Sequence, residues 1–597
     1  MTTMGENMKD DDRLTLTLAD ALVGALRDWD VRYVFGVSGA NVEHVHDAVH
    51  RLGDGRLTSV MARREDGAAF MADGRARVHR TLGVCCATSG GGMMNLAVGL
   101  AESYAESVPV LALVGQPPAA LEGRGAFQDG SGIGRAVDAR AMLAAITKKT
   151  VKVDPARFWE QLRDAVDTAL SGRPGPVALL LPRDVYEQPV GPRPADWPED
   201  LADVVVTAPP DPAAVRRLFD AVRAASKPVL VLGHGVRRSP DGAAVVDFAR
   251  RAGVPVATTM SARAEFPNDD PLFLGVVGVT GHPSAHAVIG DADLVVVAGA
   301  GLNVMTRGPL GALDPARVAV VNIDPDDPRR AVDPGIVVAG DVGAVARLLL
   351  EHLAAEPFAK SPFPRYELSR FVPRPADPVD RTPHPRDDGD DLTQSEAITA
   401  LSAWLPTNGH IVLDAGNCAS AVIHLSDVPP GTSSTIALGA GGMGYSLGAA
   451  VGAQLGSPEG ARTMVFCGDG AFLMNGLEVH TAVDLGLPAL YVIFNNGMHG
   501  MCVTRQQTFF DGRIECVSYT PVDIAAVARG LGEPDRLWVG SAGTLAELRE
   551  RLVDYHERHG DRPGLLELRL PAEEVPPFTP FLPADEATTT EWAGAAS

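Results

Sequence analysis

The sequence predicts an α/β fold built from three doubly wound, parallel-sheet domains. Short apolar runs such as PVLVLG and TMVFCGDG alternate with helix-length segments along most of the 597 residues. Continuous apolar runs are typical of strands buried on both faces, and parallel strands require a crossover, usually a helix, between them. A chain of this length cannot bury its apolar residues in one core, so we expect several domains, each with its own sheet.

Two breaks in this alternation divide the chain into three parts of similar size. They lie at about 183–212 and at 357–391, and both are rich in proline, which interrupts helices and central strands. We therefore expect an N-terminal domain at 13–190, a central domain at 208–356, a proline-rich linker at 357–392, a C-terminal domain at 393–573 and a polar tail at 577–597.

Each domain contains three apolar runs that we interpret as central strands. The runs are short for helices and rich in β-branched residues, which favours strands. They lie at 33–37, 84–88 and 108–115 in the first domain, 228–233, 294–300 and 318–324 in the second, and 410–416, 463–470 and 490–496 in the third. Between the last two runs, a segment of helical spacing ends at Gly486 before Pro488, which predicts a strand–helix–strand unit.

Composition and charge exclude two classes of function. The chain is 46% hydrophobic, and its net charge of −23 argues against binding nucleic acid, whose phosphates require a basic face. The same charge repels small anions at long range, so an anionic substrate needs local cations. The uncharged stretch 428–457 could span a bilayer in length, but Gly, Ser and Ala dominate it. We interpret it as a buried loop and helix and expect no membrane association.

The cysteines and the start of the chain bear on its compartment. The six cysteines form no CxxC pair and most stand in apolar context, so we interpret them as reduced thiols. The first residues are acidic and polar, whereas a secretory signal needs a basic flank and an apolar core. We expect a cytoplasmic protein.

Polar side chains follow two of the expected strands in the third domain. Asp469 stands between Gly468 and Gly470 directly after one run, and Asn495 and Asn496 end the next. The ligand crevice of an open parallel sheet lies beyond the carboxyl ends of its strands, so these side chains can face one crevice. A carboxylate oxygen, an amide oxygen and a backbone carbonyl suit Mg²⁺ that takes further ligands from phosphates. Taken separately, GDG is also a tight turn and NN a helix-capping loop. Their joint placement favours the metal site.

Two further segments contain candidate binding residues. Met443 lies among glycines in GAGGMGYSLGAA, where the backbone can approach a flat ligand closely before an expected helix. Glu65 lies at an apparent helix start in RREDGAAFMADGRAR. Both have a purely structural alternative, because glycines also serve helix packing and a glutamate at a helix start favours the helix dipole.

These segments resemble a known enzyme family. The chain is similar to the thiamine-diphosphate-dependent enzymes, most closely to acetolactate synthase large subunits, in RREDGAAFMADGRAR, CATSGGGMMNLAVGL, VPVLALVGQ, AFQD and GDGAFLMNGLEVHTAVDLGLPALYVIFNNGMHGM. The separation of Asp469 and Asn496, 496 − 469 = 27 residues, matches the GDG-to-NN motif of that family. The resemblance covers nearly the whole chain in order. It implies a pyrimidine-binding domain first, a central domain of nucleotide-binding type and a diphosphate-binding domain last. Each active site would lie between subunits of a homodimer or homotetramer.

The resemblance implies thiamine diphosphate and Mg²⁺ as cofactors. Asp469, Asn496 and the carbonyl of Met498 would hold Mg²⁺ on the diphosphate. Met443 would bend the cofactor, and the carbonyl of Gly441 would accept a hydrogen bond from its exocyclic amine. The other cofactor-binding positions are Gly442, Gly468, Gly470, Ala471, His499, Gly500 and Met501.

Glu65 would be the catalytic carboxylate. By hydrogen-bonding the pyrimidine ring nitrogen, it would favour the imino tautomer that removes the C2 proton of the thiazolium ring. The activated cofactor adds to a 2-oxo acid and CO₂ leaves. The resulting carbanion then attacks an acceptor carbonyl or is protonated.

Two positions favour attack on an acceptor. Benzoylformate decarboxylase-like members of the family have a histidine and a serine at the positions of Thr88 and Ala40. Neither proton-handling group is present, and Gln128 follows Phe127 as in acetolactate synthases. The resemblance implies a carboligase with a 2-oxo acid donor such as pyruvate and a carbonyl acceptor. Two alternatives stay open: a non-ligating 2-oxo acid decarboxylase, because other histidines could reach the site, and a cofactor-binding subunit without turnover.

The expected substrate pocket departs from the family pattern. Ser38 stands where these synthases usually have a proline, and Gly39, Ala40 and Asn41 follow it in a more polar donor wall. Arg505 stands where acetolactate synthases have a tryptophan that shapes the acceptor pocket.

Arg505 could supply the local cation that an anionic substrate needs, because a guanidinium binds carboxylate or phosphate bidentately. The alternative is a solvated helix arginine. Lys148 matches a family lysine near the pocket mouth and could contribute, and His499 replaces a glutamine.

The central domain raises the question of FAD, which acetolactate synthases carry there as a structural cofactor. Residues 275–281 (GVVGVTG), NIDPDD and GDV resemble the flavin-contact segments. The segment GAGLNVMTRG, from Gly299, lacks the arginine that the family has third in this loop. A flavin site and a purely structural domain both stay open.

Overall fold

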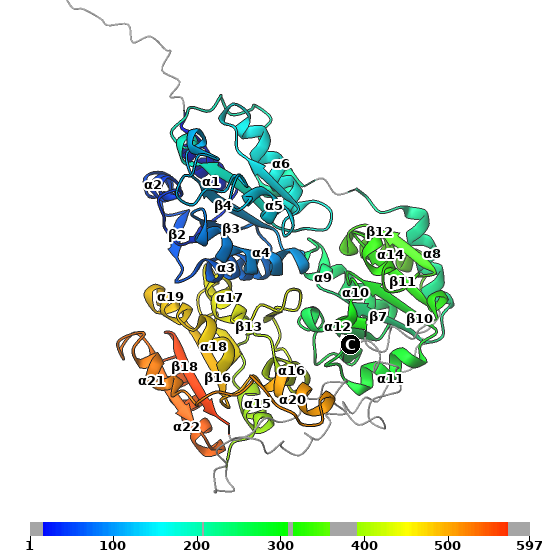
Figure 1. Ribbon diagram of the computed structural model, residues 1–597. Coiled ribbons are helices and arrows are strands. Elements are labelled where there is room, and N and C mark those ends of the chain that lie inside the picture. The colour runs from blue at the N-terminus through cyan, green and yellow to red at the C-terminus, as the bar shows by residue number, and fades with distance from the viewer. Residues whose placement is uncertain (1–15, 206–207, 308–313, 359–390, 571–597) are drawn as a thin grey trace, which may run out of the picture. The chain divides into compact units, whose positions relative to one another are not determined.

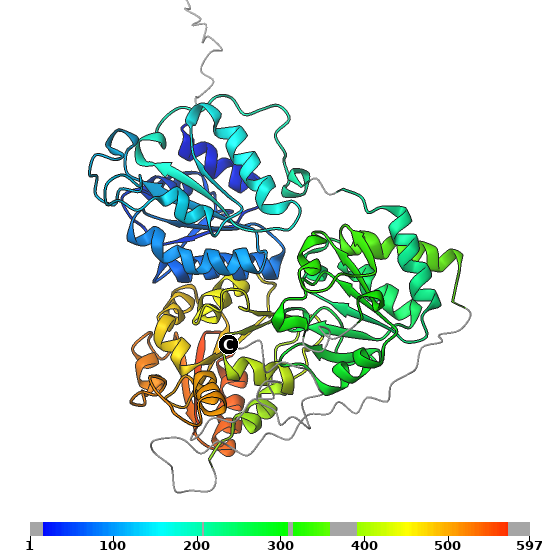
Figure 2. The ribbon, with the colours of Figure 1, turned by 45° about the vertical axis from the view of Figure 1, so that its right-hand side comes forward.

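The computed structural model describes residues 16–205, 208–307, 314–358 and 391–570 (Figure 1). These residues form three six-stranded sheets in which every strand pairing is parallel. Helices flank the sheets, as the turned view in Figure 2 also shows. The predicted α/β class with three doubly wound sheets is confirmed. The predicted tail lies outside the described residues, and so does the predicted linker apart from two residues at each end.

The chain forms two compact units. The first consists of Met1–Ala72 and Thr81–Val206, and the second of Asp73–Arg80 and Thr207–Ser597. One sheet belongs to the first unit and two belong to the second. The predicted domain boundaries stay predictions.

The sheet of the first unit has the strand order β2-β1-β3-β4-β6-β5. Its strands are β1 (Tyr33–Gly36), β2 (Thr58–Met61), β3 (Gly83–Ala87), β4 (Val110–Gln116), β5 (Lys149–Lys152) and β6 (Val177–Pro182). The helices of this part of the chain are α1 (Leu18–Asp28), α2 (Glu43–Leu52), α3 (Glu65–His79), α4 (Gly91–Ala105), α5 (Ala139–Ala144), α6 (Phe158–Leu170) and α7 (Leu201–Val204). The last turns of α3 belong to the second unit.

The first sheet is covered by apolar helix faces. In α1, Leu18, Leu22 and Leu26 recur every fourth residue and are fully buried in the core, as expected of an amphipathic helix. The same core includes Trp197 and Val204, so chain beyond the last strand of the sheet also packs against it.

The central sheet has the order β12-β11-β10-β7-β8-β9. Its strands are β7 (Pro228–Leu232), β8 (Val256–Thr259), β9 (Phe273–Val277), β10 (Leu294–Ala298), β11 (Val318–Asn322) and β12 (Ile336–Ala339). Its helices are α8 (Pro212–Ala224), α9 (Gly235–Arg238), α10 (Gly242–Ala252), α11 (Pro283–Asp291), α12 (Val304–Arg307), α13 (Asp326–Arg329) and α14 (Val342–Ala355).

Strand β7 shows why its sequence is apolar throughout. Leu230 and Leu232 point into one core, whereas Val229 and Val231 point into another. Because successive side chains of a strand face opposite sides of the sheet, a strand covered on both sides has no solvent-facing position.

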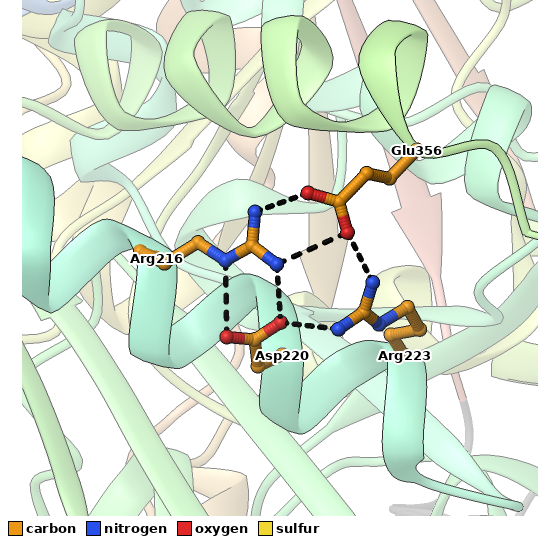
Figure 3. Close-up of polar contacts among 4 residues, drawn as sticks. All are labelled: Arg216, Asp220, Arg223 and Glu356. Carbon is orange, nitrogen blue, oxygen red and sulfur yellow. Dashed lines mark hydrogen bonds and ion pairs between the residues drawn. The ribbon is translucent and has the colours of Figure 1, made fainter.

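An ion network joins the two helices α8 and α14 of the central domain (Figure 3). Asp220 accepts hydrogen bonds from Arg216 at 2.9 Å and from Arg223 at 2.7 Å. Glu356, at the end of α14, pairs with both arginines. These pairs, Arg216 first, lower the pKa of Glu356 to about 2.

The third sheet has the order β14-β13-β15-β16-β18-β17. Its strands are β13 (His410–Leu413), β14 (Ser433–Ile436), β15 (Thr463–Gly468), β16 (Ala489–Asn495), β17 (Trp538–Ala542) and β18 (Gly564–Arg569). Its helices are α15 (Gln394–Ser402), α16 (Asn417–Leu425), α17 (Tyr445–Gln454), α18 (Asp469–Asn475), α19 (Glu478–Leu485), α20 (Gly500–Phe509), α21 (Ile524–Arg529) and α22 (Leu545–Arg558).

The uncharged stretch forms a strand and a helix of this domain. Within it, β14 pairs with β13, and every residue of α17 is buried. This confirms the predicted buried helix, whereas the glycine-rich loop before it is exposed at 439–441. In the described part of the chain, no helix is both long and apolar enough to cross a membrane.

Arg263 links the central and third domains within the second unit. Its side chain is 1% exposed. It donates to the carbonyls of Ser426 at 2.8 Å and Val422 at 3.3 Å, and to Ser426 Oγ at 3.0 Å. Burial lowers the pKa of Arg263 to about 10. The guanidinium thus caps the carboxyl end of α16.

Candidate active site

Three neighbouring strands of the third sheet end in polar residues at one edge. Asp414 follows β13, Asp469 follows β15, and Asn495 and Asn496 end and follow β16. Strand β15 lies between the other two, and Gly468 pairs in register with Phe494. The predicted placement of the two motifs beyond adjacent strand ends is therefore confirmed.

Asp469 connects the two motifs directly. One carboxylate oxygen accepts from the backbone N–H of Gly497 at 2.7 Å and of Asn496 at 3.2 Å. The other accepts from the N–H of Gly470 at 2.7 Å. The side chain is 2% exposed, and burial raises its pKa while these backbone N–H groups oppose that effect. The carboxylate holds the GDG turn against the NN turn.

The turn after β16 presents several oxygen atoms. The side-chain oxygen of Asn496 accepts from the N–H of Met498 at 3.3 Å, and Gly497 has a positive φ of 72°. Met498 is buried with Val503 and Val517, and it bridges to Ser518. No cluster of three His, Cys, Asp or Glu side chains exists among the described residues. A cation here would therefore need amide and carbonyl oxygens beside the carboxylate.

Met443 and His499 meet at the GDG turn. A Cβ atom built on Gly470 would lie 2.7 Å from His499 Cε1 and 3.4 Å from Met443 Cε. The His499 ring in turn lies edge-on to Tyr519, with ring centroids 5.7 Å apart. The structure thus brings Met443, Gly470 and His499 together, and a side chain at position 470 would have to displace the His499 ring.

Asp414 is a residue of this edge that the sequence reasoning missed. It is fully buried, and its oxygens accept from the N–H of Gly444 at 3.0 Å, the N–H of Ser446 at 2.9 Å and Ser446 Oγ at 2.7 Å. Burial raises its pKa. Asp414 therefore fixes the turn between Met443 and α17. The signal that could have found it is the one that identified Asp469: a carboxylate directly after an apolar run.

Glu65 lies in the first unit, at the start of α3 beyond β2. It accepts a hydrogen bond from Asn95 Nδ2 at 2.8 Å. Gly92 lies directly against it, because a Cβ atom there would be 3.0 Å from Glu65 Oε1 and 3.1 Å from the methyl carbon of Thr88. The Glu65 carboxylate thus lies against the first turn of α4, which begins with glycines, and beside Thr88.

Gln128 belongs to the same edge of the first sheet. Its side-chain oxygen accepts from Ser89 Oγ at 3.3 Å, and Ser89 Oγ accepts from Asn41 Nδ2 at 2.7 Å. Gln128 has a positive φ of 60°, unusual for a residue with a side chain. A Cβ atom on Gly39 would lie 2.7 Å from Thr88 Cβ. The structure therefore gathers Gly39, Asn41 and Gln128 around the turn that follows β3.

The other predicted pocket residues of this unit are exposed or lie at the opposite end of the strands. Ser38 and Ala40 are exposed, and Phe127 is 86% exposed on the surface of its unit. Lys148 precedes β5 and therefore lies at the amino end of the parallel strands, opposite the edge that holds Gln128. Its ammonium donates to the carbonyl of Ser171 at 2.9 Å, and burial lowers its pKa. Within this unit, the structure does not bring Lys148 to the Gln128 group.

Arg505 lies in α20 and is exposed. Its guanidinium carbon is 5.6 Å from the centre of the Phe509 ring. No described carboxylate forms an ion pair with it. Gly441 is exposed, and Gly442, Gly500 and Met501 are half-buried around the GDG and NN turns.

The candidate flavin segments of the central domain lie at one edge of its sheet. GVVGVTG covers the end of β9, the described part of GAGLNVMTRG (299–307) follows β10, NIDPDD begins at the last residue of β11, and GDV follows β12. Gly278 has a φ of 122°, which strongly favours glycine. These positions are where an open parallel sheet binds a ligand.

Family models for thiamine pyrophosphate enzymes match all three domains. The N-terminal TPP binding domain matches residues 16–133, the central domain 215–349, and the C-terminal TPP binding domain 414–567.

Curated relatives match over nearly the whole chain. A protein of Methanocaldococcus jannaschii named probable acetolactate synthase large subunit is 30% identical over 94% of this chain and 93% of its own length. The acetolactate synthase isozyme 1 large subunit of Escherichia coli is 29% identical over 97% and 98%. The acetolactate synthase large subunit of Corynebacterium glutamicum is 30% identical over 87% and 82%.

Proposed function

We propose, from the premise that the chain belongs to the thiamine pyrophosphate enzymes and is an enzyme of the acetolactate synthase type, that it is a carboligase. It decarboxylates a 2-oxo acid, pyruvate in the simplest case, and transfers the acyl carbanion to an acceptor carbonyl. The observation that most directly supports the cofactor chemistry of this proposal is the joining of the GDG and NN turns through Asp469, with Met443 beside Gly470.

The residues of the third domain fit Mg²⁺ and a diphosphate. Asp469 offers a buried carboxylate, Asn496 an amide oxygen and Met498 a backbone carbonyl, which is an oxygen-only set of the kind Mg²⁺ prefers. A side chain at Gly470 would fill the space between Met443 and His499, so the glycine keeps backbone accessible there. When bound, thiamine diphosphate supplies a carbon nucleophile and an electron sink for decarboxylation.

Glu65 would hold the proton that activates this chemistry. The side-chain amide of Asn95 donates to one carboxylate oxygen of Glu65, and the other oxygen lies against Gly92, which has no side chain. A partly buried carboxylate that a neutral amide orients can bind a ring nitrogen by sharing a proton. From the resemblance to the family, we propose that each active site forms between subunits of a homo-oligomer, with Glu65 and Asp469 contributed by different subunits.

Exposed apolar side chains support such an assembly. Met94 and Val98 on α4 are each 46% exposed in the first unit, and Met474 and Leu477 are 51% and 58% exposed in the second. Exposed apolar groups on consecutive helical turns are typical of protein interfaces. The dimeric or tetrameric state and the cytoplasmic location remain parts of the proposal.

Carboligation is favoured over simple decarboxylation by the residues around Glu65. Thr88 and Ala40 place no imidazole or hydroxymethyl group where a decarboxylase of this family would protonate the carbanion. Instead, a series of hydrogen bonds links Asn41, Ser89 and Gln128 beside Thr88. The Ser89 hydroxyl already donates to Gln128, and neither Thr88 nor Ala40 offers an imidazole, so this environment would favour transfer to an acceptor carbonyl over protonation.

The substrate experiment separates the two branches. Purified protein with thiamine diphosphate and Mg²⁺ is given pyruvate and a panel of 2-oxo acids, alone and with aldehyde or oxo-acid acceptors. Coupled products by mass spectrometry support the carboligase, whereas aldehyde as sole product favours the non-ligating decarboxylase.

A variant tests the role of Glu65. Glu65→Gln should abolish CO₂ release and retain cofactor binding by calorimetry. Unchanged turnover would contradict the mechanism. An absorbance spectrum of the purified protein tests whether the central domain holds FAD, because a bound flavin absorbs visible light and no side chain does.

A further inference from the structure

Glu567 is a buried carboxylate to which the proposed mechanism assigns no role. It lies in β18, where it pairs in register with Ile493 of β16 and Ser541 of β17. It is 2% exposed, and no Lys, Arg or His among the described residues forms an ion pair with it. A buried charge without a countercharge is costly unless hydrogen bonds compensate it.

Four hydrogen bonds hold this carboxylate. One oxygen accepts from Asn495 Nδ2 at 2.6 Å and from the N–H of Ile524 at 3.2 Å. The other accepts from the N–H of Ala525 at 3.2 Å and from Ser541 Oγ at 3.3 Å. The shortest bond is the one to Asn495. It is also shorter than the 2.8 Å bond from Asn495 Nδ2 to the carbonyl of Val522, so Glu567 is the nearer partner of the Asn495 side chain.

The contact fixes the orientation of the Asn495 amide. Its nitrogen donates to Glu567 and also to the carbonyl of Val522 at 2.8 Å. Both partners are acceptors, so the amide cannot flip without placing its oxygen against them. Asn495 is 7% exposed, and the N–H of Leu570 donates to its carbonyl at 2.9 Å. The side chain of Asn495 is therefore anchored to β18, and its backbone to the residue just beyond that strand.

Asn495 is the last residue before the turn that faces Asp469. The next two N–H groups, of Asn496 and Gly497, donate to Asp469. The side chain of Asn496 can meet an ion only if this turn keeps its place relative to Asp469. The backbone of Asn495 leads into this turn and holds its first end, and the contact of Met498 with Ser518 holds the other.

We propose that Glu567 is a positioning residue: by locking Asn495, it presets the turn 496–498 for the divalent cation. The inference rests on the proposed function, because it assigns the cation to that turn. It gives the first asparagine of the NN pair a role distinct from that of the second, which offers its oxygen to the ion.

The test measures magnesium affinity rather than activity. The full-length apo protein is titrated with Mg²⁺ at saturating thiamine diphosphate in a calorimeter, for the wild type, Glu567→Gln, Asn495→Ala and the double variant. Removing a group that orients a metal ligand typically weakens metal binding by about 10–100-fold. We expect about a tenfold rise in the half-saturating Mg²⁺ concentration for each single variant and little further rise in the double variant.

A matched control separates positioning from stability. Glu478 is 1% exposed, lies in the same domain and accepts from Thr481 Oγ1 at 2.8 Å. Glu478→Gln should lower the unfolding temperature without changing the half-saturating Mg²⁺ concentration. If Glu567→Gln does not fold, as judged by circular dichroism and gel filtration, Asn495→Ala decides. That variant keeps the other three hydrogen bonds of Glu567.

The outcomes distinguish the inference from the function on which it rests. If the wild type binds thiamine diphosphate equally well with and without Mg²⁺, the proposed cofactor site fails. If the wild type depends on Mg²⁺ and the Glu567 and Asn495 variants show wild-type half-saturation, the positioning role is overturned and the site stands. Additive effects in the double variant would also overturn it, because residues that act through one contact are not additive.

Discussion

Substituting Gly444 tests how tightly the Met443 turn is built. Gly444 precedes α17 with φ 85° and ψ 0°, in the left-handed region. A Cβ atom there would lie 2.8 Å from Asn475 Cβ. The left-handed backbone costs an L-residue about 1–2 kcal/mol, and crowding a packed site costs about 1–3 kcal/mol more. We therefore expect Gly444→Ala to lower the free energy of unfolding by about 2–5 kcal/mol.

Gly460→Ala is the matched control for this variant. Gly460 has φ 83°, yet a Cβ atom there would meet nothing within 4 Å. It should show the backbone cost alone, about 1–2 kcal/mol. Denaturant unfolding of both variants, with calorimetric titration of thiamine diphosphate, measures the two effects. Equal destabilisation by the two substitutions would refute the inferred crowding. Unchanged cofactor affinity in Gly444→Ala would refute the link between this turn and the site.

Three further predictions concern a buried cation, a surface network and an exposed arginine. Arg263→Met should destabilise the second unit by about 2–4 kcal/mol, because lost charge-assisted hydrogen bonds outweigh the relief of burying the guanidinium; equal stability in denaturant melts would contradict this. Glu356 has a lowered folded pKa of about 2 against an ordinary 4.5, so its contribution is present above pH 4.5 and lost as pH falls towards 2. The stability difference between wild type and Glu356→Gln should therefore close over that acid range, and a difference that persists unchanged at pH 2 would count against the network. Arg505→Gln should raise the KM for an anionic acceptor about tenfold or more while leaving the KM for a neutral aldehyde acceptor unchanged; equal effects on both would assign Arg505 to the solvated surface.

The sequence identified the central strands because burial on both faces leaves them wholly apolar. Every expected run corresponds to an observed strand, with ends that differ by a few residues. The strands it did not single out include β2 and β5, which lie at sheet edges and keep exposed positions. An edge strand such as KTVK has too few apolar residues to be recognised from the sequence.

For the candidate site, local patterns were sufficient where chemistry follows a strand directly. Asp469 and Asn496 lie where the motif spacing indicated, and Asp414 was missed although it carries the same signal. Glu567 and Asn475 could not have been found this way. Glu567 contacts Asn495 across 72 residues, and no local pattern encodes such a partner. The role of Lys148 stays a prediction; within its own unit it precedes β5, at the amino end of the strands.

The central claim is that Asp469 and the turn 496–498 hold a divalent cation on thiamine diphosphate. Calorimetric titration of the apo protein with thiamine diphosphate, with and without Mg²⁺, tests it for the wild type and for Asp469→Ala. The account predicts binding to the wild type only with Mg²⁺ and none to Asp469→Ala that still folds. Binding of equal affinity to both proteins, or binding indifferent to Mg²⁺, would contradict it.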